Sequence, residues 1–122
     1  MSGNRVLVVD DDADIRDLVA LKLQASGIDV DTAPDGVQGL EKANTGNFDA
    51  VVLDVMMPGM SGIDVLQAMR NAGNQTPVIM LTAKTQEHDV EAGFTAGAND
   101  YVSKPFSPRE LLARVNSILQ RS

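Results

Sequence analysis

The 122-residue sequence contains no cysteine, which excludes a disulfide framework and thiolate ligands for a metal ion. It has no apolar run near the ~18 residues of a membrane span and no signal-peptide pattern at its N-terminus. Basic residues are also few, and the formal net charge of −7 argues against direct binding of nucleic acid, which depends on neutralising phosphates. We therefore expect residues 1–122 to form one domain of a cytoplasmic protein, with no membrane partner and no direct nucleic-acid partner.

Short apolar runs and amphipathic segments alternate along the chain. The apolar runs predict strands at Val6–Val9, Asp29–Thr32, Val51–Leu53, Pro77–Leu81 and Tyr101–Ser103. Apolar residues at helical spacing predict helices over Ala13–Ser26, Gly36–Ala43, Gly62–Ala72 and Gln86–Ala96, and a last helix that begins after Ser107. Five strands alternating with five helices indicate the α/β class, with a doubly wound parallel sheet covered on both faces. The alternating pattern of Asp29–Thr32 suits a strand near the sheet edge.

Polar side chains follow four of the predicted strands, at the point where each strand ends. Asp10 and Asp11 come after the first strand, Asp54 after the third, Thr82 after the fourth and Lys104 after the fifth. The carboxyl ends of parallel strands lie along one edge of a sheet, where open α/β proteins bind their ligands. We therefore expect these side chains to lie close together and to form the functional site.

The expected site combines several carboxylates with one ammonium group. Two carboxylates ~5 Å apart repel by about 3 kcal/mol at an effective dielectric constant near 20, so the cluster should raise the pKa of one member or bind a cation. Oxygen ligands without thiol or imidazole favour a hard ion, and Mg²⁺ fits. Lys104 would add a positive charge for a phosphate oxygen. A nucleophilic Asp54 among these groups suits phosphoryl transfer.

The motifs of the sequence are similar to those of a response-regulator receiver domain, the CheY-like, flavodoxin-like module of two-component signalling. The similarity spans essentially the whole chain and rests on the acidic pair Asp10-Asp11, on Asp54-x-x-Met57-Pro58-x-x-x-Gly62, on Thr82-Ala83 and on Asp100-Tyr101-x-x-Lys104-Pro105-Phe106. The resemblance implies the strand order 2-1-3-4-5. It also implies a phosphorylation-activated switch whose donor is a sensor histidine kinase or a phosphotransfer protein, and whose downstream effector the sequence does not identify.

The resemblance further implies a role for each site residue. Asp54 would be the phosphorylated aspartate. Asp11, Asp54 and the backbone carbonyl of Met56 would bind Mg²⁺ directly, and Asp10 would act mainly through water. Lys104 would contact the phosphoryl group, and the Lys104–Pro105 peptide is expected to be cis.

Thr82 and Tyr101 are the switch residues that the resemblance implies. Thr82 would bind the phosphoryl group, and Tyr101 would then turn inward and change the surface formed by the fourth helix, the fifth strand and the fifth helix. The domain would catalyse only its own phosphorylation and dephosphorylation, so we do not expect an enzyme that converts a metabolite.

The last predicted helix resembles that of OmpR/PhoB-type receivers, which dimerise through charges on the same surface. Asp100, Glu110 and Arg114 match part of that charge set, whereas Ala92 stands where a basic residue is expected. We therefore expect a monomer and leave dimerisation on phosphorylation open.

Two other functions remain open from the residues. Asp10-x-Asp12 after the first strand also resembles the motif of haloacid-dehalogenase-type phosphatases, in which Asp10 would be the nucleophile and Asp54 incidental, although Asp14 stands where that motif has threonine or valine. A plain interaction module would take up no phosphoryl group from acetyl phosphate. An EF-hand is excluded, because Ile15 replaces the glycine of its sharp turn.

Overall fold

A computed structural model describes residues 4–83, 94 and 96–121 of the protein. These residues form one parallel sheet of five strands in the order β2-β1-β3-β4-β5. The strands are β1 (Arg5–Val9), β2 (Asp29–Ala33), β3 (Ala50–Asp54), β4 (Val78–Ala83) and β5 (Asp100–Lys104). The predicted strand order and the edge position of Asp29–Thr32 are both confirmed.

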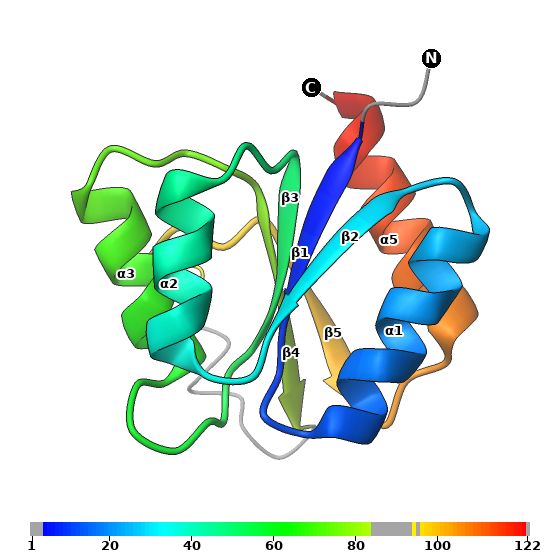
Figure 1. Ribbon diagram of the computed structural model, residues 1–122, viewed down its shortest axis with the longest axis horizontal. Coiled ribbons are helices and arrows are strands. Elements are labelled where there is room, and N and C mark those ends of the chain that lie inside the picture. The colour runs from blue at the N-terminus through cyan, green and yellow to red at the C-terminus, as the bar shows by residue number, and fades with distance from the viewer. Residues whose placement is uncertain (1–3, 84–93, 95, 122) are drawn as a thin grey trace.

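Helices cover both faces of the sheet. Within the described ranges they are α1 (Ala13–Ala25), α2 (Gly36–Thr45), α3 (Gly62–Asn71) and α5 (Pro108–Arg121). Helices α1 and α5 lie on one face, and α2 and α3 lie on the other (Figure 1). The helix expected over Gln86–Ala96 lies mostly outside the described residues, although Phe94 and Ala96 have helical conformation. None of the helices in the described part of the chain has the length and apolar character needed to cross a membrane.

The sheet separates two hydrophobic cores, and successive residues of each strand enter opposite ones. In β1, Val6 and Val8 face the core under α1 and α5, whereas Leu7 and Val9 face the core under α2 and α3. All four side chains are fully buried. Burial on both faces explains why the sequences of the central strands read as continuous apolar runs rather than as alternating ones.

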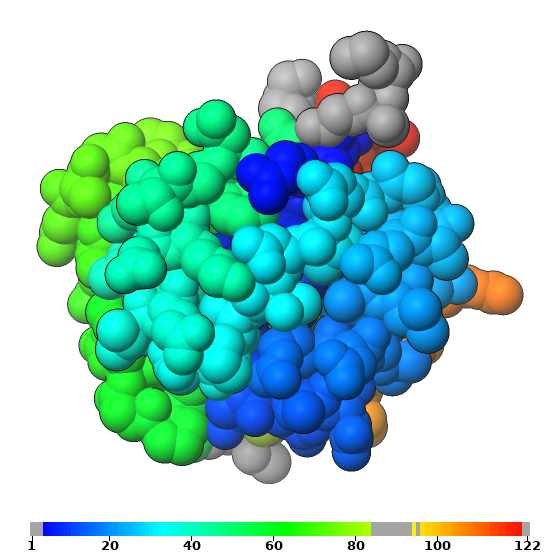
Figure 2. Space-filling model, in the orientation of Figure 1, coloured from blue at the N-terminus to red at the C-terminus, as the bar shows by residue number. Residues whose placement is uncertain are grey.

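Strand β2 forms one edge of the sheet and carries charged side chains there. Asp29 pairs with Arg5 at 3.1 Å, and Asp31 pairs with Lys42 of α2 at 3.1 Å. In Figure 2 the cyan atoms of β2 lie at the surface between the blue atoms of α1 and the green-cyan atoms of α2. Charges along an open edge discourage pairing with a strand of another chain.

Side-chain caps set where the helices begin. The Asp12 carboxylate accepts hydrogen bonds from the backbone N–H groups of Asp14 and Ile15, so Asp12 is the N-cap of α1. Helix α3 begins with a capping box in which the Ser61 hydroxyl and the Asp64 carboxylate each accept a bond from the other residue's backbone N–H. Each cap fixes the start of a helix at the edge of the sheet where the strands end and where the predicted site lies.

Replacing Leu66 of α3, whose side chain is fully buried, tests the packing of the core under α2 and α3. Leu66→Ala should lower the free energy of unfolding in urea by about 3 kcal/mol, because it removes apolar contacts and leaves a cavity. Leu21 on α1 is the matched control, since 66% of it is exposed. Leu21→Ala should change stability by less than about 0.5 kcal/mol. Equal effects of the two substitutions would contradict the packing described here.

Candidate functional site

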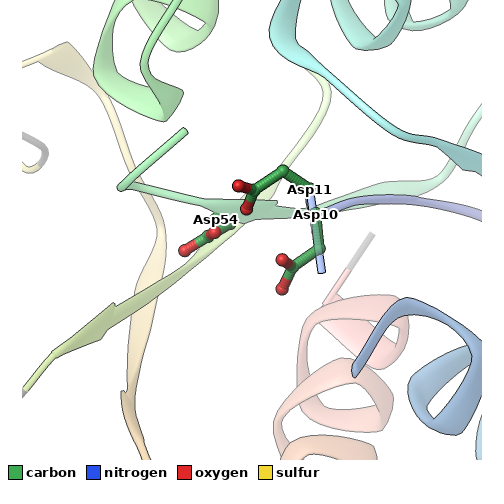
Figure 3. A group of neighbouring side chains, drawn as sticks. All are labelled: Asp10, Asp11 and Asp54. Carbon is green, nitrogen blue, oxygen red and sulfur yellow. The ribbon is translucent and has the colours of Figure 1, made fainter. Parts of the chain in front are cut away.

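Three carboxylates meet where β1 and β3 end. Asp54 is the last residue of β3, and Asp10 and Asp11 directly follow β1. The register pairs Val9 with Leu53, which brings the next residue of each strand to the same level. One carboxylate oxygen from each of Asp10, Asp11 and Asp54 lies within 4.8 Å of the others, and Figure 3 shows these side chains together at the strand ends.

The ammonium group of Lys104 joins two of these carboxylates. Lys104 is the last residue of β5 and precedes a cis peptide bond to Pro105. Its Nζ lies 3.2 Å from Oδ1 of Asp54 and 3.4 Å from Oδ2 of Asp10. Asp10 and Asp54 are buried, whereas Asp11 is exposed. The site thus has a buried, charge-paired interior and one carboxylate that faces solvent.

Arg16 of α1 holds the backbone of the acidic pair, a contact that the sequence did not reveal. Its guanidinium donates a 2.9 Å hydrogen bond to the carbonyl oxygen of Asp10. The Asp10 carboxylate also accepts a 3.0 Å bond from the backbone N–H of Asp12. The turn after β1 is therefore fixed from both its main chain and its side chain.

Gly62, which the sequence presented only as part of a motif, lies against the backbone of Asp54. Its N–H donates a 3.0 Å hydrogen bond to the carbonyl of Val55. A Cβ at this position would collide with the carbonyl group of Asp54. Only glycine lets the start of α3 approach the end of β3 this closely, so Gly62 helps to fix the carboxylate in place.

The electrostatics of the site depend on burial. Burial, followed by the charge of Asp10, raises the pKa of Asp54 to about 7, although Lys104 opposes the shift. Burial alone would lower the pKa of Lys104, but the carboxylates of Asp54 and Asp10 raise it above its usual value. The ammonium is therefore firmly charged, while Asp54 is held near the point where it gains or loses a proton at neutral pH.

The side chains of Thr82 and Tyr101 project from the same face of the sheet. Tyr101 pairs with Met80 in the β4–β5 register, and Thr82 lies two residues further along β4. Thr82 is buried, and among the described residues its hydroxyl donates a long, 3.4 Å hydrogen bond to the Ala83 carbonyl. Tyr101 is half-buried, with its ring 4.6 Å from that of Phe94.

A groove of about 540 Å³ opens beside the carboxylates. Its lining consists of Asp11, Val55, Met56, Met57, Pro58 and Ser61. Met56 and Asp11 thus line the same groove. The grouped carboxylate oxygens of Asp10, Asp11 and Asp54 form an all-oxygen donor set of the kind that suits Mg²⁺.

Comparison with known proteins identifies the family. Residues 6–116 match the response regulator receiver domain family. The chain is 49% identical over 120 residues to the alkaline phosphatase synthesis transcriptional regulatory protein PhoP of Bacillus subtilis, a match that covers 98% of this chain and 50% of PhoP. The chain therefore spans about half the length of this relative.

Solved structures agree with the sequence match. The receiver domain of the Francisella response regulator 1452 superposes with a TM-score of 0.90 at 42% identity, over 98% of both chains. The BeF3-activated receiver domain of DrrB, a Thermotoga maritima OmpR/PhoB homologue, superposes with a TM-score of 0.88 at 41% identity, over 99% of this chain and 100% of that one. These matches do not support the phosphatase alternative with Asp10 as nucleophile. The chain belongs to the response regulator receiver domain family, the domains of two-component response regulators that are phosphorylated on aspartate.

Proposed function

We propose that Asp54 accepts the phosphoryl group and that a sensor histidine kinase or a phosphotransfer protein donates it. The observation that carries this proposal is the place of the Asp54 carboxylate, which is buried at the end of β3 and lies 3.2 Å from the Lys104 ammonium. A carboxylate held beside a fixed cation is prepared to bind a group that brings further negative charge.

Mg²⁺ is the proposed cofactor. Asp11, Asp54 and the Met56 carbonyl would bind it directly, and Asp10 would act mainly through water. When bound, the ion offsets the repulsion among the carboxylates and the charge of the transferring phosphoryl group. The fit of the all-oxygen donor set supports this assignment.

Phosphoryl transfer to Asp54 requires correct positioning of the two reacting groups but no separate general base, because the ionised carboxylate has no proton to lose. An oxygen of Asp54 attacks the phosphorus of the donor phosphohistidine, so that the O–P bond forms as the N–P bond breaks and the imidazole leaves with the electron pair. Lys104 binds a phosphoryl oxygen and favours the ionised form of Asp54, opposing the burial that raises its pKa. Water attack on the same phosphorus later releases phosphate. Receiver domains are not classical enzymes, and we propose that this one catalyses only these two reactions on itself.

Thr82 and Tyr101 form the proposed switch. A bound phosphoryl group offers the Thr82 hydroxyl a charged acceptor in place of its long bond to Ala83, and charge-assisted hydrogen bonds are about twice as strong as neutral ones. Movement of Thr82 leaves space on the face that it shares with Tyr101, whose ring then turns inward. The surface of β5 and α5 changes as a result.

The output is proposed to lie in a partner or a further domain in the cytoplasm. PhoP is named a transcriptional regulatory protein, and we propose that any contact of this regulator with DNA is made by an output domain rather than by this acidic chain. The Asp100–Arg114 ion pair of 3.3 Å and Glu110 lie on β5 and α5, so this surface carries the part of the OmpR/PhoB-type charge set that the sequence retains.

The phosphoryl donor must approach next to Lys104, and an apolar groove of about 360 Å³ opens there. It is lined by Ile15, Leu18, Lys104, Pro105 and Phe106. Leu18 is 50% exposed on α1. We propose that the donor protein docks on this groove, because exposed apolar surface beside a site that must meet a protein is typical of an interface.

The phosphoacceptor assignment is tested with acetyl phosphate and Mg²⁺, with uptake followed by intact-protein mass spectrometry. Asp54→Asn should reduce uptake to background, because the amide cannot form the acyl phosphate. Asp17→Asn, on exposed α1, is the control and should be phosphorylated like the unaltered protein. Uptake by Asp54→Asn at the control level would overturn the assignment.

The raised pKa of Asp54 predicts how stability depends on pH without metal. Between about pH 4 and 7 the folded protein binds more protons than the unfolded chain, so this carboxyl makes stability fall as pH rises, by on the order of 2 kcal/mol. Urea unfolding in chelator at about pH 5 and pH 8 should show that fall in the native protein and a smaller one in Asp54→Asn. Equal slopes in both proteins would contradict the shift, and Asp17→Asn should retain the native slope.

Donor docking is tested by separating two phosphoryl sources. Leu18→Asp should slow transfer from a histidine-phosphorylated kinase that phosphorylates the native protein by about tenfold or more, because a charge in the groove is poorly accommodated. Uptake from acetyl phosphate should not change. Val37→Asp on α2, where Val37 is 68% exposed, is the control and should leave both rates unchanged. A Leu18→Asp protein with normal transfer from the kinase would exclude this surface.

A further inference from the structure

Arg70, the second-to-last residue of α3, lies at the edge of the sheet opposite to the carboxylates and ties together three segments of the chain. Its Nη1 donates hydrogen bonds to the carbonyl oxygens of Asn74 at 2.9 Å and Thr76 at 2.8 Å. Its Nη2 donates to the carbonyl of Gly97 at 2.9 Å and to Oδ1 of Asn99 at 3.3 Å. One guanidinium therefore links the end of α3, the loop before β4 and the segment that enters β5.

The acceptors of Arg70 in these bonds are carbonyl and amide oxygens rather than carboxylates. Burial lowers the pKa of Arg70, yet a guanidinium stays charged in proteins. Its charge is thus balanced by the dipoles of groups whose positions are fixed by the backbone. The planar fork of arginine can reach both pairs of acceptors at once, which the single ammonium of lysine cannot do.

Gly97 makes room for this contact. Its φ of +111° favours glycine, and a Cβ at this position would lie 2.9 Å from Nε of Arg70. The close contact therefore depends both on the long side chain of Arg70 and on the absence of a side chain at Gly97.

Asn99 extends the link to the first residue of β4. Its backbone N–H donates to the carbonyl of Val78 at 2.9 Å, and its Oδ1 accepts from the N–H of Val78 at 2.9 Å. Arg70 bonds to the same Oδ1. The starts of β4 and β5 are consequently locked to each other and to α3, two residues before Tyr101 and its partner Met80.

We propose that Arg70 is the positioning residue of the switch, because it fixes the starts of β4 and β5 so that a displacement at Thr82 reaches Tyr101. With these starts locked, β5 cannot slide along β4 when the carboxyl end of β4 moves. The displacement of Thr82 is then taken up by the side chain of Tyr101, which lies between the locked strand starts and Thr82. Without the lock, the start of β5 absorbs the displacement. This inference rests on the proposed roles of Thr82 and Tyr101, and it adds a residue at the opposite end of the strands from the phosphoryl site.

The lock is tested first in the unphosphorylated protein by amide hydrogen exchange. In Arg70→Lys the N–H groups of Val78 and Asn99 should exchange at least about tenfold faster, because their hydrogen bonds are no longer held in place. Arg5→Lys is the matched control. Arg5 is also half-buried at this edge and lies 4.7 Å from the ring of Phe48, but its guanidinium donates to Asp29 and its backbone N–H donates to the Asp49 carboxylate. Unchanged exchange in Arg70→Lys, or equal acceleration in Arg5→Lys, would overturn the inference.

Coupling is tested by fluorescence. Tyr101 is the only tyrosine and the chain has no tryptophan, so tyrosine emission reports on this residue alone. With Mg²⁺ and beryllofluoride, the change in emission should fall to less than about half of the native amplitude in Arg70→Lys, because the displacement no longer reaches Tyr101. Uptake of phosphoryl from acetyl phosphate should stay within about twofold of the native rate. Arg5→Lys should retain both.

A native fluorescence response in Arg70→Lys would contradict the inference. If Arg70→Lys folds poorly by circular dichroism, Asn99→Ala replaces it, since this change removes the acceptor that Arg70 and Val78 share, and the same results are expected. Failure of the native protein to take up a phosphoryl group would contradict the proposed function instead, and the exchange experiment would still decide whether Arg70 holds the two strand starts.

Discussion

The ion pair between the buried Asp54 and the half-buried Lys104 is the contact on which the rest of the structure depends. Burial and the neighbouring charge of Asp10 work against an ionised Asp54, and the ammonium 3.2 Å away works for it. Such a balance needs rigid surroundings, because a small displacement of either group would leave a buried charge unpaired. The parallel sheet supplies that rigidity. Strands covered on both faces end together at one edge, the start of α3 packs against Asp54 through Gly62, and Arg16 holds the turn after β1.

Much of the fold follows from local patterns in the sequence. The apolar runs at Val6–Val9 and Val51–Leu53 became central strands because both of their faces are buried, and Asp29–Thr32 became an edge strand because one side must meet water. Helix starts were also readable where a side chain caps its own helix, as at Ser107. The strand order was not readable from spacing, since crossover helices of similar length connect neighbouring and distant strands alike. It came from the family resemblance, and the pairing of β1 with both β2 and β3 confirms it.

The grouping of the polar side chains at the site was predictable only in part. Asp54 and Lys104 each end a strand and Asp10 directly follows one, so parallel topology alone brings them together. Arg16 and Arg70 could not be found in this way. Both act by donating to backbone carbonyls, and every residue has such a carbonyl, so no residue type marks the partner in the sequence. Gly62 and Gly97 mark two close backbone approaches, to Asp54 and to Arg70. The sequence shows the glycines but not the groups that approach them, so these contacts could not be predicted.

The most direct test of the claim that Asp54 is the phosphoacceptor is to identify the residue that carries the phosphoryl group. Protein treated with acetyl phosphate and Mg²⁺ is reduced with borohydride, which converts an aspartyl phosphate into homoserine, and the product is mapped by peptide mass spectrometry. The account predicts homoserine at position 54 and at no other aspartate, in an amount that rises with phosphoryl uptake. Homoserine at position 10 or 11, or phosphorylated protein that yields no homoserine, would contradict it.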